Sequence, residues 1–192
     1  RLIQLRKRSK LLTPSMSFYQ VPNFIFNPIA QRQLCTGSVL LPTDYTGGLA
    51  EELKRCGLSD IRDNSIEAAV QDPEWWLQHM SDVDWVVAIT QGLKENTDWI
   101  TDYGLTVARK GVCILDRLTF LEPTRKRESF LKASALTNLI ILSPRPSFRA
   151  DGKQLKDSVT SAWFVFQKGG DADIKTEIDF EVGWQRPKSI CP

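Results

Sequence analysis

The fold is decided by residues 139–169, which read LIILSPRPSFRADGKQLKDSVTSAWFVFQKG. Leu139 to Leu142 and Thr160 to Phe166 are β-branched and aromatic runs of strand length, with prolines and a glycine between them. We expect the two runs to form an antiparallel pair of strands. The connecting loop has more basic than acidic residues, which suits a phosphate backbone, although an ordinary solvated loop would have the same composition.

Upstream of this stretch, helical and strand patterns alternate along the chain. Asp72-Pro73-Glu74 is typical of an N-cap followed by proline at the first helical position, and Lys110-Gly111 is typical of a helix end. The patterns predict helices near 27–34, 47–56, 73–80, 93–109 and 123–133, and strands at 38–42, 84–89, 111–118, 138–143 and 159–167. This alternation predicts an open α/β sheet, mostly parallel, with one antiparallel strand near the C-terminus.

Three segments resemble phage-type and plasmid-type N6-adenine DNA methyltransferases. The segments are RPSF (145–148) with DGK (151–153) and DSVTSAWFV (157–165); DWVV (84–87) with GVCILDRLTFLE (111–122); and VLLPTDYTGGLA (39–50). The resemblance covers roughly residues 17–168. It implies a Rossmann-type, S-adenosylmethionine-dependent domain over residues 17–170, preceded by a basic arm (1–16) and followed by a C-terminal extension (171–192) packed on or flanking the domain.

The catalytic positions implied by this resemblance have lost the residues that the chemistry needs. In the family, the fourth strand ends in Asn or Asp, two prolines and an aromatic, which orient the adenine amine and stack on the extruded base. Here the same positions hold Ile89, Thr90, Gln91 and Gly92. Ile89 offers no side-chain acceptor and Gly92 offers no ring, while the Thr90 carbonyl or a shifted Gln91 could accept one hydrogen bond.

The cofactor positions implied by the resemblance are also altered. These positions are Val21, Pro22, Pro42, Tyr45, Gly47 and an acid after the second strand, either Asp60 or Asp63. Tyr45 stands where the first glycine of the loop would allow close backbone approach. Leu41 replaces the leading acid, and Val21 replaces a threonine that helps to hold the methionine carboxylate. Only residues 59–83 separate the first long helix from the strand at Asp84, so we expect the second and third strands to be shortened or rebuilt.

Composition limits the remaining classes of site. The net charge is only +2, so nucleic-acid affinity must come from local clusters such as residues 1–10 and 125–127. The candidate phosphate contacts are Arg117, Arg145, Arg149 and Lys153.

The chain has one histidine, His79, which argues against a multi-histidine metal centre, and no metal is expected. No apolar run reaches the ~18 residues of a membrane span, and the four cysteines have no C-x-x-C spacing, so we expect a cytoplasmic protein with reduced thiols.

Three functions remain open at this point. The leading expectation is a degenerate, catalytically inactive methyltransferase-like domain that acts as a binding or structural subunit, with DNA or a protein as partner and without a cofactor. The first alternative is an active S-adenosylmethionine-dependent DNA N6-adenine methyltransferase with a non-standard motif. The second is a protein-interaction subunit of a larger assembly. Trp163 is expected to be a core residue rather than a platform for a base.

Overall fold

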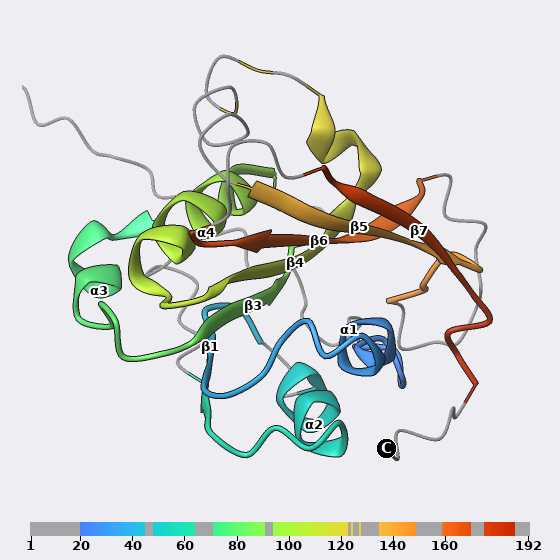
Figure 1. Ribbon diagram of the computed structural model, residues 1–192, viewed down its shortest axis with the longest axis horizontal. Coiled ribbons are helices and arrows are strands. Elements are labelled where there is room, and N and C mark those ends of the chain that lie inside the picture. The colour runs from blue at the N-terminus through green and yellow to red at the C-terminus, as the bar shows by residue number, and fades with distance from the viewer. Residues whose placement is uncertain are drawn as a thin grey trace, which may run out of the picture.

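In the computed structural model, the described residues form a seven-stranded sheet with the strand order β2-β1-β3-β4-β6-β5-β7 (Figure 1). It describes residues 20–44, 48–63, 71–90, 94–122, 124, 127, 135–148, 159–169 and 175–186. The strands are β1 (Val39–Leu41), β2 (Ile61–Asp63), β3 (Trp85–Ile89), β4 (Gly111–Arg117), β5 (Ala135–Ser143), β6 (Ser161–Gln167) and β7 (Glu177–Val182). The helices are α1 (Asn27–Gln31), α2 (Gly48–Arg55), α3 (Pro73–Leu77), α4 (Lys94–Val107) and the 3-10 turn η3 (Leu118–Leu121).

One strand of the sheet runs against all the others. β1, β2, β3 and β4 are parallel, β6 is antiparallel to both β4 and β5, and β7 is parallel to β5. The expected pairing of the two C-terminal apolar runs, and the mostly parallel sheet with one reversed strand, are therefore confirmed. β2 has only three residues, and no described residue forms a strand between β2 and β3.

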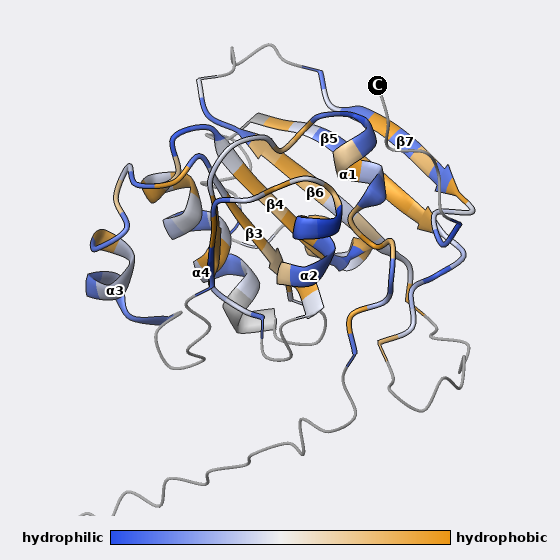
Figure 2. Ribbon diagram, turned by 90° about the horizontal axis from the view of Figure 1, so that it is seen from below, coloured by the Kyte–Doolittle hydropathy of each residue, from blue (hydrophilic) through white to orange (hydrophobic). Residues whose placement is uncertain are grey.

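Helices cover the sheet on both faces, and the central strand β3 is buried and apolar along its whole length. α1 and α2 lie over one face, as Figure 2 shows, and α3 and α4 pack on the other. Trp163 of β6 is fully buried, donates its Nε1–H to the Ile25 carbonyl at 2.9 Å and meets Phe26 edge to face. Its neighbour Phe164 is buried on the opposite face against Phe120. Trp163 is thus a core residue, as expected.

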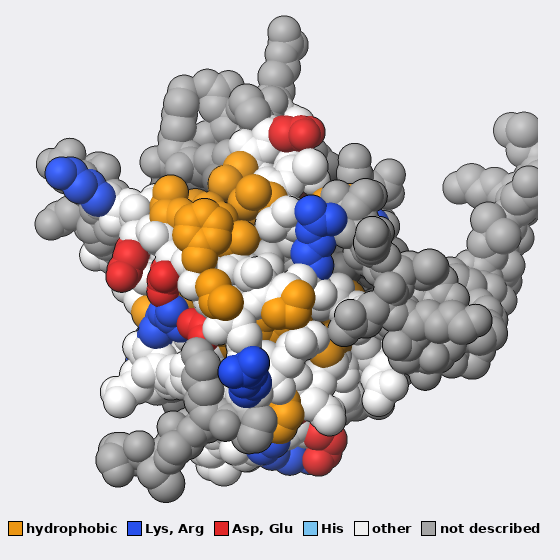
Figure 3. Space-filling model, turned by 90° about the vertical axis from the view of Figure 1, so that its right-hand side faces the viewer, with side chains coloured by type: hydrophobic (Ala, Val, Ile, Leu, Met, Phe, Trp, Pro, Cys, Tyr) orange, Lys and Arg blue, Asp and Glu red, His pale blue; other side chains and the backbone are white. Residues whose placement is uncertain are grey.

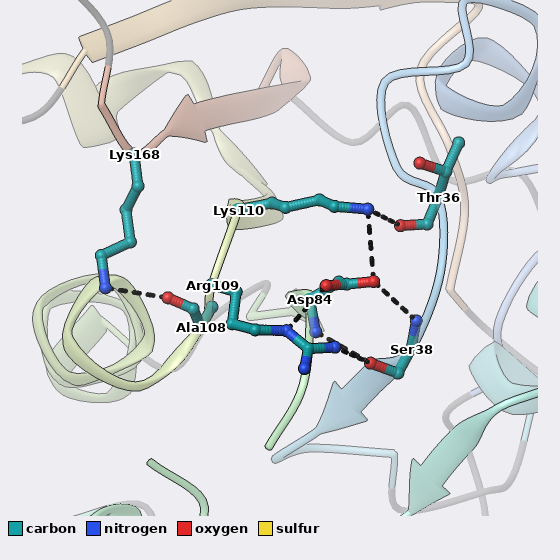
Figure 4. Close-up of polar contacts among 7 residues, drawn as sticks. All are labelled: Thr36, Ser38, Asp84, Ala108, Arg109, Lys110 and Lys168. Carbon is teal, nitrogen blue, oxygen red and sulfur yellow. Dashed lines mark hydrogen bonds and ion pairs between the residues drawn. The ribbon is translucent and has the colours of Figure 1, made fainter. Parts of the chain in front are cut away.

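The helix ends differ in detail from the sequence-based expectation. Asp72 accepts a hydrogen bond from Glu74 N–H, so the predicted cap of α3 is confirmed. The helix predicted at 93–109 is α4, which ends two residues earlier at Val107, and Gly111 is the first residue of β4, as the strand predicted at 111–118 requires. At the end of α4, Lys168 Nζ donates to the Thr106 carbonyl at 3.1 Å and to the carbonyl of Ala108, just after the helix, at 2.9 Å (Figure 4). The helix expected at 123–133 lies almost entirely outside the described residues.

A charged cluster holds the amino-terminal edge of the parallel strands together. Asp84 accepts hydrogen bonds from Arg109 Nε at 2.9 Å, Lys110 Nζ at 3.2 Å and the Ser38 amide at 3.3 Å (Figure 4). Burial raises the pKa of the Asp84 carboxyl, but the bonds from Lys110 and Arg109 outweigh it, and the pKa lies below the ordinary value. The ionised carboxylate therefore stabilises the folded state.

The Asp84 cluster gives a testable pH dependence. A carboxyl whose pKa is lower in the folded than in the unfolded state stabilises the fold at pH values above its unfolded-state pKa, near 3.9. This stabilisation is lost as the pH falls through the folded-state pKa. We expect Asp84→Asn to be less stable than the parent protein at pH 7, with the difference shrinking below about pH 4. Urea titrations at several pH values measure this. Asp82→Asn is the control, because Asp82 is exposed in its pair with Arg62.

Candidate functional site at the carboxyl edge of the sheet

The carboxyl ends of β1, β2, β3 and β4 meet at one edge of the sheet. In open parallel sheets, ligands bind outside these ends, where neighbouring strands lead to helices on opposite faces. Here β1 leads into α2 on one face and the adjacent β3 precedes α4 on the other, so the switch point lies between β1 and β3. The residues that follow these two strands are therefore the candidates for ligand contact.

The loop after β1 places a carboxylate on the first turn of α2. Asp44 is buried and accepts hydrogen bonds from the backbone amides of Leu49 at 3.1 Å and Ala50 at 2.7 Å. Desolvation by burial raises the pKa of Asp44 against these bonds, and the nearby charges of Asp63 and Glu51 raise it further. Backbone amides at a helix N-terminus bind anions. Asp44 therefore occupies a position where the anionic group of a ligand could otherwise bind.

At the end of β3, the described residues of the predicted catalytic position are buried and make contacts within the protein. Ile89 is 6% exposed and packs in the apolar cluster beneath α1 and α2. Thr90 is 1% exposed, its amide bonds the Leu115 carbonyl of β4 at 3.0 Å, and its hydroxyl donates to the same oxygen at 3.5 Å. Gln91 and Gly92 lie outside the described residues. The described part of the position thus offers no side-chain acceptor directed at a substrate amine.

The N-terminal cofactor positions contribute to the core. Val21 is buried in the same apolar cluster as Ile89, while the Gln20 amide next to it bonds the Phe148 carbonyl at 2.9 Å. Pro22 is half-buried and Pro42 is buried. Tyr45 and Gly47 lie outside the described residues.

The two candidate acids after the first long helix lie at opposite edges of the sheet. Asp63 ends β2 at the carboxyl edge, close enough to Asp44 to influence its pKa. Asp60 precedes β2 and, with Asp84 and Arg109, lines an open polar pocket of about 310 Å³ at the amino edge. The structure therefore does not bring Asp60 together with Asp44, and Asp63 is the acid that stands beside the loop.

Basic residues at the same carboxyl edge come from two strands. Arg117 is the half-buried last residue of β4, and the exposed Arg145 follows β5, which runs in the same direction as β4. Arg149 and Lys153 lie outside the described residues. Two polar residues at this edge did not stand out in the sequence: Asp116, buried and bonded by Thr97 Oγ1 at 2.7 Å, and Thr43, whose buried Oγ1 has no hydrogen-bond partner.

The described residues contain neither a metal-binding cluster nor a membrane-spanning helix. No group of three or more His, Cys, Asp or Glu side chains there could hold a metal ion. No helix in that part of the chain is long and apolar enough to cross a bilayer. Cys35, Cys56 and Cys113 are free thiols.

Comparison with known proteins gives structural neighbours alone, since no family model and no curated protein matches the chain. A solved structure from Listeria monocytogenes, named as a class I S-adenosylmethionine-dependent methyltransferase, aligns with a TM-score of 0.54 at 14% identity, covering 88% of this chain and 67% of that one. A predicted O-methyltransferase from Agrobacterium tumefaciens has 14% identity, TM-score 0.39 and coverages of 75% and 66%. A Haemonchus contortus phosphoethanolamine N-methyltransferase has 9% identity, TM-score 0.40 and coverages of 73% and 38%.

The chain spans about two thirds or less of the length of these neighbours. At such low identity, the alignment with the Listeria protein establishes the architecture and leaves substrate and activity open. The chain therefore has the Rossmann-like α/β fold of class I S-adenosylmethionine-dependent methyltransferases.

Proposed function

We propose that this chain is a methyltransferase-fold domain that has lost methyl transfer and acts as a DNA-binding or structural subunit. The observation that best supports this proposal is that the Asp44 carboxylate accepts hydrogen bonds from the amides of the first turn of α2. S-adenosylmethionine would supply the transferable methyl group, but its methionine end carries a carboxylate. Asp44 already takes up the Leu49 and Ala50 amides that a carboxylate of the ligand could bind, and Val21 is packed in the core. Asp44 and Val21 therefore argue against a bound S-adenosylmethionine at this edge.

The end of β3 supports the same proposal. N6 methylation of adenine needs acceptors that direct the amine lone pair, and each well-placed contact is worth on the order of 10² to 10⁴ in rate. Ile89 is packed in the apolar cluster, and the Thr90 hydroxyl is directed at the Leu115 carbonyl. We expect no incorporation of labelled methyl groups into duplex DNA above the rate without protein.

An active methyltransferase is the second candidate, and two features favour it. Asp63 stands at the carboxyl end of β2, where a carboxylate could accept hydrogen bonds from ribose hydroxyls, and Thr43 Oγ1 is buried without a partner. Methyl incorporation that is lost in Gln91→Ala would favour this candidate. Incorporation unaffected by that variant would indicate a contaminating enzyme.

DNA binding is proposed from the basic residues at the carboxyl edge. Arg117 and Arg145 come from β4 and the segment after β5, and both can meet phosphates at one surface. We expect Arg145→Glu to weaken binding of duplex DNA and to reduce the slope of log K against log salt by about 1. Fluorescence anisotropy at several salt concentrations measures both quantities.

The matched control for this experiment is Lys54→Glu. Lys54 is an exposed cation in the last turn of α2 and therefore lies away from the carboxyl edge, so the same change of charge should leave the slope unchanged. Equal slopes for the parent protein, Arg145→Glu and Arg117→Glu would overturn the DNA-binding part of the proposal.

A further inference from the structure

Two cysteines from separate parts of the chain meet in the core. Cys35 belongs to the connection between α1 and β1, whereas Cys113 lies within β4, where it pairs with Val87 of β3 and Val165 of β6. Both cysteines belong to the apolar cluster beneath α1 and α2, and their thiol groups interact directly. The fold therefore brings together two thiols that are far apart in the sequence.

Polar contacts hold the segment that follows Cys35 against the amino ends of β3 and β4. Lys110 Nζ donates to the Thr36 carbonyl at 3.2 Å, and the Ser38 amide donates to Asp84 Oδ2 at 3.3 Å (Figure 4). Lys110 directly precedes β4, and Asp84 directly precedes β3. These contacts fix the connection beside the strand that carries the second cysteine, independently of the thiols themselves.

Both thiols lie inside the molecule. Cys35 is 4% exposed and Cys113 is fully buried. The large exposed apolar side chains are found elsewhere, among them Ile178, Phe180 and Val182 of β7, on the side of the molecule that carries the apolar patch in Figure 3. A bulky thiol reagent therefore cannot reach either sulfur in the folded protein, and only a small oxidant can reach the edge of Cys35.

The surroundings of the two thiols give them different roles. Burial raises the pKa of the Cys113 thiol well above its ordinary value, and the neighbouring Cys35 thiol raises it further. Because the thiolate is the reactive form, Cys113 is protected from direct oxidation. Cys35 is the first of the two to meet an oxidant, and Cys113 already lies in place to react with the product.

We propose that Cys35 and Cys113 form a redox-sensitive lock, which closes as a disulfide bond when the protein is exposed to hydrogen peroxide. The Cys35 sulfur attacks one peroxide oxygen, the O–O bond breaks, and a sulfenic acid and one water are formed. The Cys113 sulfur then attacks the Cys35 sulfur, the S–O bond breaks, and the hydroxyl leaves with the Cys113 proton as a second water. The two thiols lose two electrons, and the peroxide is reduced to two waters.

The fold favours closure of this lock over other products of oxidation. The two sulfurs are neighbours, so the second step is intramolecular and the effective concentration of the attacking thiol is high. Cys113 is fixed in the sheet, whereas Cys35 lies in a connection that can shift until the sulfurs reach the S–S distance of about 2.05 Å. The bond would tie this connection to β4 and close a long loop, which stabilises the fold by restricting the unfolded chain. The lock does not depend on the carboxyl edge and goes beyond the function proposed above.

Peroxide treatment of the folded full chain tests the lock. The double variant Cys56→Ser with Cys191→Ser leaves Cys35 and Cys113 as the only cysteines. After exposure to millimolar hydrogen peroxide, we expect mass spectrometry to find a peptide cross-linked between these two residues. The midpoint of urea unfolding should rise by roughly 1 M and return to its original value after reduction with a phosphine.

Single substitutions in the same background separate the two steps. In Cys113→Ser, peroxide should convert Cys35 to a sulfenic acid that dimedone traps, whereas in Cys35→Ser the Cys113 thiol should remain unmodified. Neither variant should gain stability on oxidation. Dithiobis(nitrobenzoate), a bulky reagent, should modify the two thiols of the folded protein only as fast as the protein unfolds. The cross-linking test itself uses no substitution at either cysteine, so it holds even if these variants are unstable.

Two results would overturn the proposal. The first is the absence of the cross-linked peptide after peroxide treatment of the folded protein. The second is a cross-link that forms only in denaturing urea, which would mean that the two thiols are not neighbours in the fold.

Discussion

Gly111→Ala is expected to destabilise the protein by about 3 kcal/mol or more. A Cβ atom at this position would clash with the Phe166 carbonyl oxygen of β6 and lie 2.8 Å from Cζ3 of Trp85 in β3. Because β4 is bonded to both neighbours, its backbone cannot move away from one without straining the ladder to the other. The cost therefore arises from backbone atoms that have no room to relax.

Urea denaturation measures the effect as a lower midpoint at an unchanged slope. Gly57→Ala is the matched control, since a Cβ there meets nothing within 4 Å and only the positive φ of +90° is unfavourable. That conformational cost is about 1–2 kcal/mol. A Gly111→Ala protein as stable as the Gly57→Ala protein would contradict the close approach of β3, β4 and β6.

Trp163→Ala is the second substitution with a large expected effect, a loss of about 3–5 kcal/mol of unfolding free energy. Trp163 is fully buried in β6, its ring meets Phe26 at a centroid distance of 5.6 Å, and its Nε1–H bonds the Ile25 carbonyl. These contacts join the central sheet to the segment that leads into α1. The alanine variant loses both the apolar contact and the hydrogen bond.

Trp163→Phe separates these two contributions. It keeps most of the ring but leaves the Ile25 carbonyl without its donor, at a cost of about 1–3 kcal/mol. Phe180→Ala serves as the exposed aromatic control and should change the free energy of unfolding by less than about 0.5 kcal/mol. If Trp163→Ala behaved like Phe180→Ala, Trp163 would have to lie at the surface, where it could contact a ligand.

The sequence predicts the sheet well where the signal is local. The runs that became β5 and β6 are apolar, of strand length and separated by turn residues, so their pairing follows from composition. The N-cap of α3 is likewise predicted correctly, because Asp72 and Pro73 are neighbours and the signal is local. The strand that begins at Gly111 was also predicted from local signals, but the close approach of the Phe166 carbonyl could not be predicted, because Phe166 is far away in the sequence.

The candidate site is less predictable because it depends on how the loops close. Asp44 precedes α2 by only a few residues, yet its contact with the Leu49 and Ala50 amides depends on the path of the loop between them. Asp60 and Asp63 differ by three positions, and only the exact limits of β2 decide which lies at the carboxyl edge. The alternation of acidic and apolar residues in β7 is visible in the sequence, but its parallel pairing with β5 is not, because the two segments are far apart in the sequence.

The central claim is tested most directly by calorimetric titration of the full chain with S-adenosylmethionine and its demethylated product. We predict no heat of binding up to millimolar ligand, because Asp44 occupies the first turn of α2 and Val21 is packed in the core. Micromolar binding of either ligand would contradict the account. The pocket would then be functional, and methyl transfer would again be the leading function.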